Sequence, residues 1–154
     1  MIDAHIFTGV ANEAQKSTRF CYLCQVTFPA DYPESCPPAG AWDLNGDFFR
    51  FATENVADLT EPRNYQSLFE LRKRNFPPAQ ECKSRDLSGF LTLPDLEIAR
   101  TRLGKKFPQY QTYPTVVLGL QSGDGLALKT PSSNNTEHHS FWVCVGIDIP
   151  QRRR

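Results

Sequence analysis

The chain lacks any apolar run close to the roughly 20 residues that a membrane-spanning helix requires, and its charged side chains sum to zero. The first residues, Met1 to His5, contain neither a basic region nor a hydrophobic stretch, so they do not read as a secretory signal. We therefore expect a soluble protein that does not enter a membrane. The same features predict a cytoplasmic location.

Cysteine and histidine are both scarce, with five and three residues. An odd number of cysteines in a chain of this length indicates reduced thiols in a reducing compartment. Cys21 and Cys24 lie in an alternating segment that predicts a strand, where residues three apart point to opposite faces. No ligand spacing indicates a metal site. Cys36 or Cys82 beside a histidine is the remaining candidate for a nucleophilic pair.

Apolar residues make up 40% of the chain and aromatic residues 12%, which is enough for a real hydrophobic core. A length of 154 residues is typical of one domain, so we expect residues 1–154 to form a single globular unit.

The C-terminal part predicts three consecutive strands, over residues 114–120, 126–130 and 141–149. The turn-forming residues Ser122 to Gly125 predict a hairpin between the first two strands. The last strand is apolar on nearly both faces, so it belongs at the centre of a sheet. Shorter strands are expected at residues 4–10, 20–28 and 48–51.

Three helices are predicted between these strands. Thr53 is a candidate N-cap for a short helix over 54–59, Asn64 for a helix that stops near Asn75, and Thr92 for one that ends at Gly104. We therefore predict an α+β fold. It consists of a mainly antiparallel sheet with a C-terminal β-meander at about 113–149, covered by two or three helices from residues 54–104.

Two long loops are the main candidates for binding. Residues 29–47 are irregular and include Trp42, which suits recognition of another protein. Residues 131–140 bring polar and titratable groups to the end of a hairpin, with Asn134 and Asn135 as candidate binding residues and His138 and His139 as candidate catalytic residues. Adjacent residues of a strand face opposite ways, so one histidine at most would line a given pocket. Our leading hypothesis is a binding domain without catalysis.

A second hypothesis is enzymatic. A strand with His5 near Thr8-Gly9, the segment Phe48 to Thr53 leading into a helix, and a late Glu137 beside a strand together resemble the layout of small ADP-ribosyltransferase-fold proteins. In those proteins a basic or histidine residue, a central Ser, Thr or Tyr, and a late Glu surround NAD. The resemblance implies His5, Thr53 and Glu137 as a catalytic trio and NAD as the cofactor.

A third hypothesis is binding of nucleic acid or another polyanion. Residues 1–62 carry three basic and nine acidic side chains, whereas residues 63–106 carry ten basic and five acidic ones. Arg72, Lys73 and Arg74 form the densest basic run of that segment. Basic side chains at the end of a helix also complement its dipole, which is the alternative explanation of the run.

Overall fold

The computed structural model describes residues 28–72 and 75–154. The strands expected at 4–10 and 20–28, together with His5, Lys73 and Arg74, lie outside the described residues, apart from Phe28. The α+β prediction is confirmed. The elements are β1 (Trp42–Asp43), β2 (Gly46–Phe51), the 3-10 helix η1 (Pro62–Tyr65), α2 (Leu68–Arg72), α3 (Pro78–Ser84), β3 (Leu87–Gly89), α4 (Leu93–Lys106), η2 (Pro108–Gln111), β4 (Thr115–Leu120), β5 (Gly125–Lys129), β6 (His139–Val143) and η3 (Ile149–Arg152).

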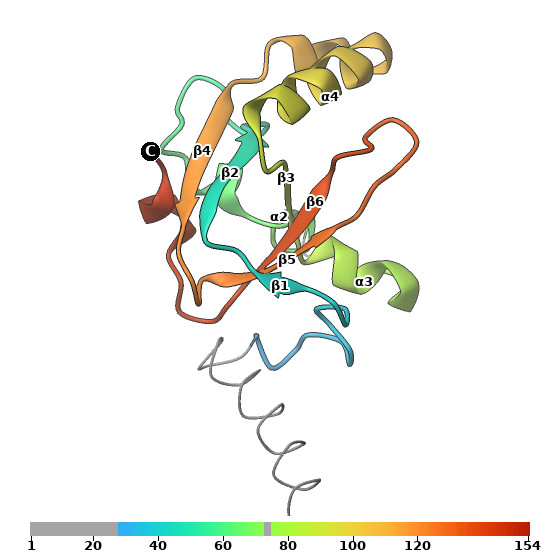
Figure 1. Cartoon of the computed structure of the whole chain (residues 1–154), viewed down its shortest axis with the longest axis vertical. Coiled ribbons are helices and arrows are strands. Elements are labelled where there is room, and N and C mark those ends of the chain that lie inside the picture. Colours follow the sequence, from blue (N-terminus) through green and yellow to red (C-terminus); the bar gives the residue numbers. More distant parts are fainter. Residues whose placement is uncertain (1–27, 73–74) are drawn as a thin grey trace, which may run out of the picture.

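The strands pair antiparallel in two sheets, one in the order β1-β5-β6-β3 and the other formed by β2 and β4. A bridge between Phe49 and Phe90 joins them through two backbone hydrogen bonds of 2.8 and 2.9 Å. Since β1 leads directly into β2, the pairing returns to its starting point and the strands enclose a small barrel (Figure 1). β6 is an inner strand, as its two apolar faces predicted.

The hairpin expected at Ser122 to Gly125 is wrong, because β4 and β5 do not pair with each other. β4 runs along β2, and β5 runs along β1, so residues 121–124 form a turn that leads the chain from one sheet to the other. A 3.0 Å hydrogen bond from the Asp124 amide to the Gln121 carbonyl closes this turn. Side chains from other parts of the chain stabilise this turn. The Asp43 carboxylate accepts hydrogen bonds from the Gly123 amide, at 2.9 Å, and from the Ser122 hydroxyl. The buried Asp124 carboxylate accepts from the Gln121 amide and from two nitrogens of Arg152.

The core fills the barrel. The rings of Phe48 and Phe141, both fully buried, meet inside it with centroids 5.8 Å apart. Buried aliphatic residues from every wall surround them: Leu44, Leu87, Val116, Leu118, Leu120, Ala127 and Ile149. Because side chains alternate along a strand, the neighbouring Phe49 points outward, where it packs against α4.

α4 agrees with its predicted N-cap. The Thr92 hydroxyl accepts a hydrogen bond from the Asp95 amide at 3.2 Å, and Leu96 and Ala99 are buried against the outer face of the barrel. The helix continues to Lys106, two residues beyond the predicted end at Gly104.

The other two helix predictions need correction. Residues 54–59 form turns instead of a helix, because the side-chain oxygen of buried Asn64 accepts hydrogen bonds from the amides of Glu54 and Asn55. Asn64 therefore caps no helix; α2 begins after Ser67. The sequence patterns did not predict β3 or α3, and α3 begins at Pro78, shortly after the predicted stop of the previous helix near Asn75.

The predicted strand over 141–149 covers β6 only in part, since β6 ends at Val143 and η3 begins at Ile149. Gly146 adopts a positive φ of 83° between them, which breaks the extended backbone. Over the ranges described, none of the helices has the length and apolar character needed to cross a membrane.

Candidate functional site

A cavity of about 700 Å³ opens on the side of the barrel that carries α2. Four segments line it: residues 29–32 of the first loop, residues 65–70 around the start of α2, the chain at Arg85 and Leu87, and the segment 143–150 after β6. The floor contains the buried side chains of Tyr65, Leu87 and Ile149, which belong to the core. The cavity thus lies where a loop and a strand end meet the barrel wall.

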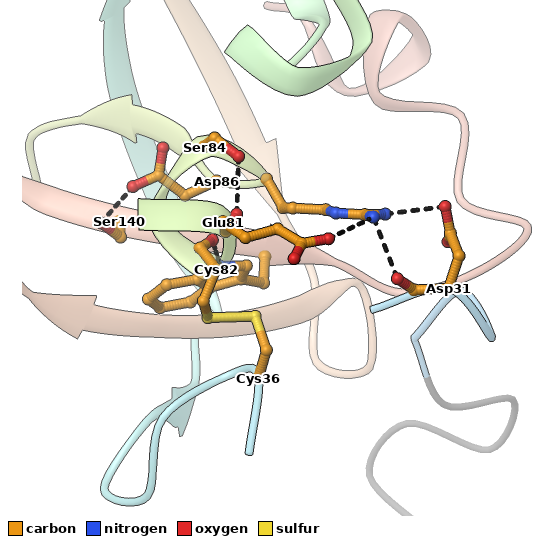
Figure 2. The surroundings of a disulfide bond; sticks show 9 residues. Asp31, Cys36, Glu81, Cys82, Ser84, Asp86 and Ser140 are labelled. Carbon is orange, nitrogen blue, oxygen red and sulfur yellow. Dashed lines mark hydrogen bonds and ion pairs between the residues drawn. A yellow bond between two sulfur atoms is a disulfide. The ribbon is translucent and has the colours of Figure 1, made fainter. Parts of the chain in front are cut away.

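Arg85 is the central charged residue of this cavity, although its side chain is only 7% exposed. Its Nη1 lies 3.0 Å from the Asp31 carboxylate, and its Nη2 lies 3.1 Å from the Glu81 carboxylate and donates to the Asp31 carbonyl at 2.9 Å (Figure 2). The guanidinium carbon lies 3.6 Å from the ring centre of Phe69 and 5.1 Å from that of Tyr32. Two carboxylates and two aromatic rings therefore hold the Arg85 side chain in one place.

The hydrogen bonds between Ser67 and Glu70 at the start of α2 fix Phe69 and Glu70 in the wall of the cavity. The Ser67 hydroxyl accepts from the Glu70 amide at 3.2 Å, and the Glu70 carboxylate accepts from the Ser67 amide at 2.6 Å. This reciprocal arrangement is a capping box, which starts α2 at a fixed point. Because Ser67 is buried, the cap anchors α2 to the barrel and aims its first turn at the cavity.

The cavity is acidic. Three carboxylates line it, those of Asp31, Glu70 and Asp148, against the one guanidinium of Arg85 among the described lining residues. Arg85 is already matched by Asp31 and Glu81. Burial, and next the charge of Glu70, raises the pKa of Tyr32 to about 12, so its phenol keeps its proton at neutral pH. The remaining negative charge favours a positively charged ligand.

A buried network of hydrogen-bonded polar side chains lies inside the protein, starting at Asp86 beside Arg85. The Ser140 hydroxyl donates a hydrogen bond to the Asp86 carboxylate and lies 2.8 Å from the Thr130 hydroxyl. That hydroxyl lies 2.8 Å from Nδ1 of His138, which is 3.1 Å from the Thr130 carbonyl. Neutral His138 with its proton on Nδ1 satisfies the whole chain of donors and acceptors, from histidine through threonine and serine to the carboxylate.

Burial controls the charge of this internal network. It raises the pKa of Asp86 to about 6 and lowers the pKa of His138 to about 4. The hydrogen bond from Ser140 and the positive charges of Arg50 and Lys83 oppose this rise of the Asp86 pKa, and burial lowers the pKa of Arg50 itself to about 10. Arg50 donates to the carbonyls of Ser88 and Asn64. The groups are buried and paired with one another, so the network fastens β6 and its loop to the chain before β3.

The predicted site residues of the 131–140 loop do not line the large cavity. The loop lies against α4, where Arg102 donates to the Thr136 hydroxyl at 3.3 Å. Asn134 and Glu137 border a hollow there of only about 10 Å³. His138 and His139 are both buried, and Nδ1 of His139 is 3.0 Å from the Glu137 carbonyl.

The proposed catalytic trio is not assembled by any contact in the part of the chain that the structure describes. Thr53 is exposed after β2, and Glu137 pairs with Lys129 at 3.1 Å in the loop after β5. His5 is outside the described residues. The NAD-using alternative stays a prediction, as does a role for Trp42, which is 40% exposed in β1.

Some basic side chains of residues 63–106 form hydrogen bonds and ion pairs within the protein. Arg85 serves the cavity, and Arg100 donates to the carbonyls of Tyr110 and Tyr113 and to the Thr115 hydroxyl. Arg72 is exposed at the end of α2, while Arg102 and Lys105 lie on α4. Binding of nucleic acid through Arg72, Lys73 and Arg74 remains a prediction.

The prediction of reduced thiols is wrong for three cysteines. Cys36 and Cys82 form a disulfide with their Cα atoms 5.5 Å apart, and Cys144 is disulfide-bonded as well. A disulfide sulfur is no activated nucleophile, so the cysteine–histidine pair is excluded at Cys36 and Cys82. In residues 28–72 and 75–154, no group of three or more His, Cys, Asp and Glu side chains is placed to hold a metal ion.

Sequence reasoning missed Arg85, Phe69 and Glu70. The motif Ser67-Leu-Phe-Glu70 was readable as a capping box before an apolar run. Nothing local distinguishes Arg85 from the other basic residues of its segment, because its partners Asp31 and Tyr32 lie more than 50 residues earlier.

The chain matches no protein-family model, no curated protein and no solved structure among those with which it was compared. Its function is therefore inferred from its own geometry.

Proposed function

We propose that this chain is a binding domain whose cavity takes up a short peptide segment of another protein, one that carries a basic side chain beside apolar ones. The cavity built around Arg85 is the observation that supports this proposal. It refines the hypothesis of protein binding through the 29–47 loop, of which residues 29–32 line the cavity. The 131–140 loop has no part in it.

The size and walls of the cavity support this ligand class. A volume of about 700 Å³ lies within the range of ligand sites, and such sites have mostly apolar walls with a few polar groups. Here the walls come from prolines, aliphatic residues and the rings of Tyr32, Tyr65 and Phe69. Apolar side chains of a peptide gain free energy by leaving water in such a place.

The charge supports a basic partner. Glu70 and Asp148 have no salt bridge within the described ranges, whereas Arg85 is neutralised by Asp31 and Glu81. A ligand ammonium or guanidinium group close to Glu70 gains an ion pair, and an acidic ligand would meet repulsion.

The disulfide bonds indicate the cellular compartment in which the chain works. They persist in oxidising surroundings such as the secretory pathway and the extracellular space, so we propose that the chain works there. The Cys36–Cys82 bond is the supporting observation. This replaces the cytoplasmic location expected from the sequence.

The binding test uses the full chain and two short peptides, Gly-Phe-Lys-Phe-Gly and Gly-Phe-Glu-Phe-Gly, in calorimetric or fluorescence titrations. We expect the lysine peptide to bind more tightly. The variant Glu70→Gln should weaken its binding roughly fivefold, the effect of one ion pair worth about 1 kcal/mol. Glutamine can keep the capping box intact, so α2 is preserved.

Glu34→Gln is the matched control, since Glu34 is an exposed acid on the loop that carries Asp31 but does not line the cavity. It should leave binding of the lysine peptide unchanged. Equal binding of both peptides, or equal weakening by both variants, would show that the cavity does not select a basic ligand.

A further inference from the structure

We propose that Asn134 is an N-glycosylation site. The sequence Asn134-Asn135-Thr136 has the Asn-x-Thr form that the N-glycosylation machinery requires, with a residue other than proline in the middle. None of the other asparagines in the 154 residues is followed two positions later by Ser or Thr. The chain therefore has a single acceptor, and its position is a specific prediction.

The structure places this acceptor at the apex of a turn. Ser132 and Asn135 exchange two backbone hydrogen bonds, of 3.2 and 3.1 Å, and the amide of His138 donates to the Asn135 carbonyl. Asn134 is one of the two residues between the bridged pair, and its side chain is exposed. Asn134 borders the small hollow against α4, but because the residue is exposed, a glycan on its amide extends into solvent.

The side chains around the acceptor have separate roles. Asn134 has no side-chain hydrogen bond among the described residues, so a glycan on its amide breaks no bond of the fold. Asn135 is half-buried, with its Oδ1 enclosed. Thr136, whose hydroxyl accepts from Arg102, is exposed. Of the two adjacent asparagines, the one that the motif selects is also the one that is free to carry a sugar.

A second observation, independent of the motif, concerns the compartment. The Cys36–Cys82 disulfide, together with the disulfide-bonded Cys144, indicates folding under oxidising conditions. N-glycans are attached in the same compartment of the secretory pathway. In this step the Asn134 amide nitrogen forms a bond to the anomeric carbon of a lipid-diphosphate-linked oligosaccharide. The carbon–oxygen bond to the diphosphate breaks, the lipid diphosphate leaves, and the amide loses one proton.

The glycan would leave the proposed ligand cavity open. The 131–137 turn contributes no residue to the cavity. It lies beside α4, while the segment that begins the described chain lies at the other end of the molecule (Figure 1). Glycosylation and peptide binding are therefore separate properties, and the failure of one leaves the other standing.

The test is expression of the full chain behind a cleavable signal peptide in a eukaryotic secretory host. Cell lysate and medium are both treated with an amidase that releases N-glycans and converts the linked asparagine to aspartate. We expect the wild-type chain to lose mass and to show that conversion at position 134 by peptide mass spectrometry. Because attachment precedes secretion, the lysate reports on it even for a variant that is poorly secreted.

Matched variants locate the site. Asn134→Gln and Thr136→Ala should carry no glycan, since each removes one essential residue of the motif. Asn135→Gln and Thr136→Ser preserve the motif and should remain glycosylated. An unglycosylated wild-type chain, or a glycan that persists on Asn134→Gln, would overturn the proposal.

Discussion

Asp86 and His138 lie at the two ends of one buried hydrogen-bonded chain, and burial shifts their pKa values in opposite directions. Between about pH 4 and 6 the folded state keeps a proton on Asp86 that the unfolded state has released. That group makes the protein less stable as the pH rises. Between about pH 4 and 6.5 the unfolded state holds a proton on His138 that the folded state lacks, so this group makes the protein more stable as the pH rises.

Single variants should separate the two contributions. In Asp86→Asn the histidine contribution remains, so we expect the free energy of unfolding to rise from pH 4 to 6. In His138→Gln the aspartate contribution remains, and we expect it to fall over the same range. Each slope is at most about 1.4 kcal/mol per pH unit. Urea titrations of both variants and the wild type, at half-unit pH steps, measure this. Slopes of the same sign, after subtraction of the wild-type curve, would contradict the account.

Gly89 marks the point where β3 crosses closest to β2. A Cβ atom there would lie 2.6 Å from the Phe48 ring and from the Phe49 carbonyl oxygen. Neither can move away, since one is in the core and the other is backbone. Gly89→Ala should therefore cost about 1–3 kcal/mol of unfolding free energy.

Gly119→Ala is the matched control, because the three atoms nearest its Cβ would all belong to the exposed, flexible side chain of Arg154. It should change the stability by no more than about 0.5 kcal/mol. Thermal unfolding of both variants gives the comparison. Equal destabilisation would mean that the closure of the barrel at Gly89 is not tightly packed.

At the scale of elements, sequence patterns predicted correctly the helix and the strand whose bounds depend on nearby residues. α4 has its predicted cap because the Thr92 hydroxyl and the Asp95 amide are three residues apart. The strand β4 agrees closely with its β-branched, apolar pattern. Both α4 and β4 could be predicted from their own residues alone.

The elements that were predicted wrongly are those whose conformation depends on hydrogen bonds to residues outside the segment. Residues 121–124 form the turn that their composition indicates, yet β4 and β5 pair with β2 and β1 instead of with each other, and Asp43 and Arg152 bind the turn. Residues 54–59 have the composition of a helix, yet Asn64 binds their first amides. The competing partners are 9 to 80 residues away, and local composition carries no signal of them.

The Cys36–Cys82 disulfide joins the first loop to α3, across a sequence separation of 46 residues. Closing a loop of that length reduces the entropy of the unfolded chain, so the double variant Cys36→Ser, Cys82→Ser should lose about 4 kcal/mol of unfolding free energy. Guanidinium titrations without reductant measure the loss. A change below about 1 kcal/mol would show that the loop is held mainly by other contacts, such as those of Arg85.

At the scale of the whole molecule, the sequence predicted the fold class but not the place of the site. The polar and titratable residues of the 131–140 loop predicted a site there, whereas the loop packs against α4. The cavity instead combines residues from four separate segments, two of which read as ordinary loop and helix. The cysteine count was read as a sign of free thiols, because pairing depends on distances that a sequence does not contain.

The central claim is that the cavity around Arg85 binds a basic, apolar peptide. The most direct measurement is a nuclear magnetic resonance titration of the isotope-labelled full chain with Gly-Phe-Lys-Phe-Gly, followed at the backbone amide, arginine side-chain and aromatic ring signals. We predict saturable shifts at Arg85, Tyr32 and Phe69, with the 131–137 turn unaffected. Shifts confined to the 131–137 turn, or no saturable shift at the cavity residues, would contradict the claim.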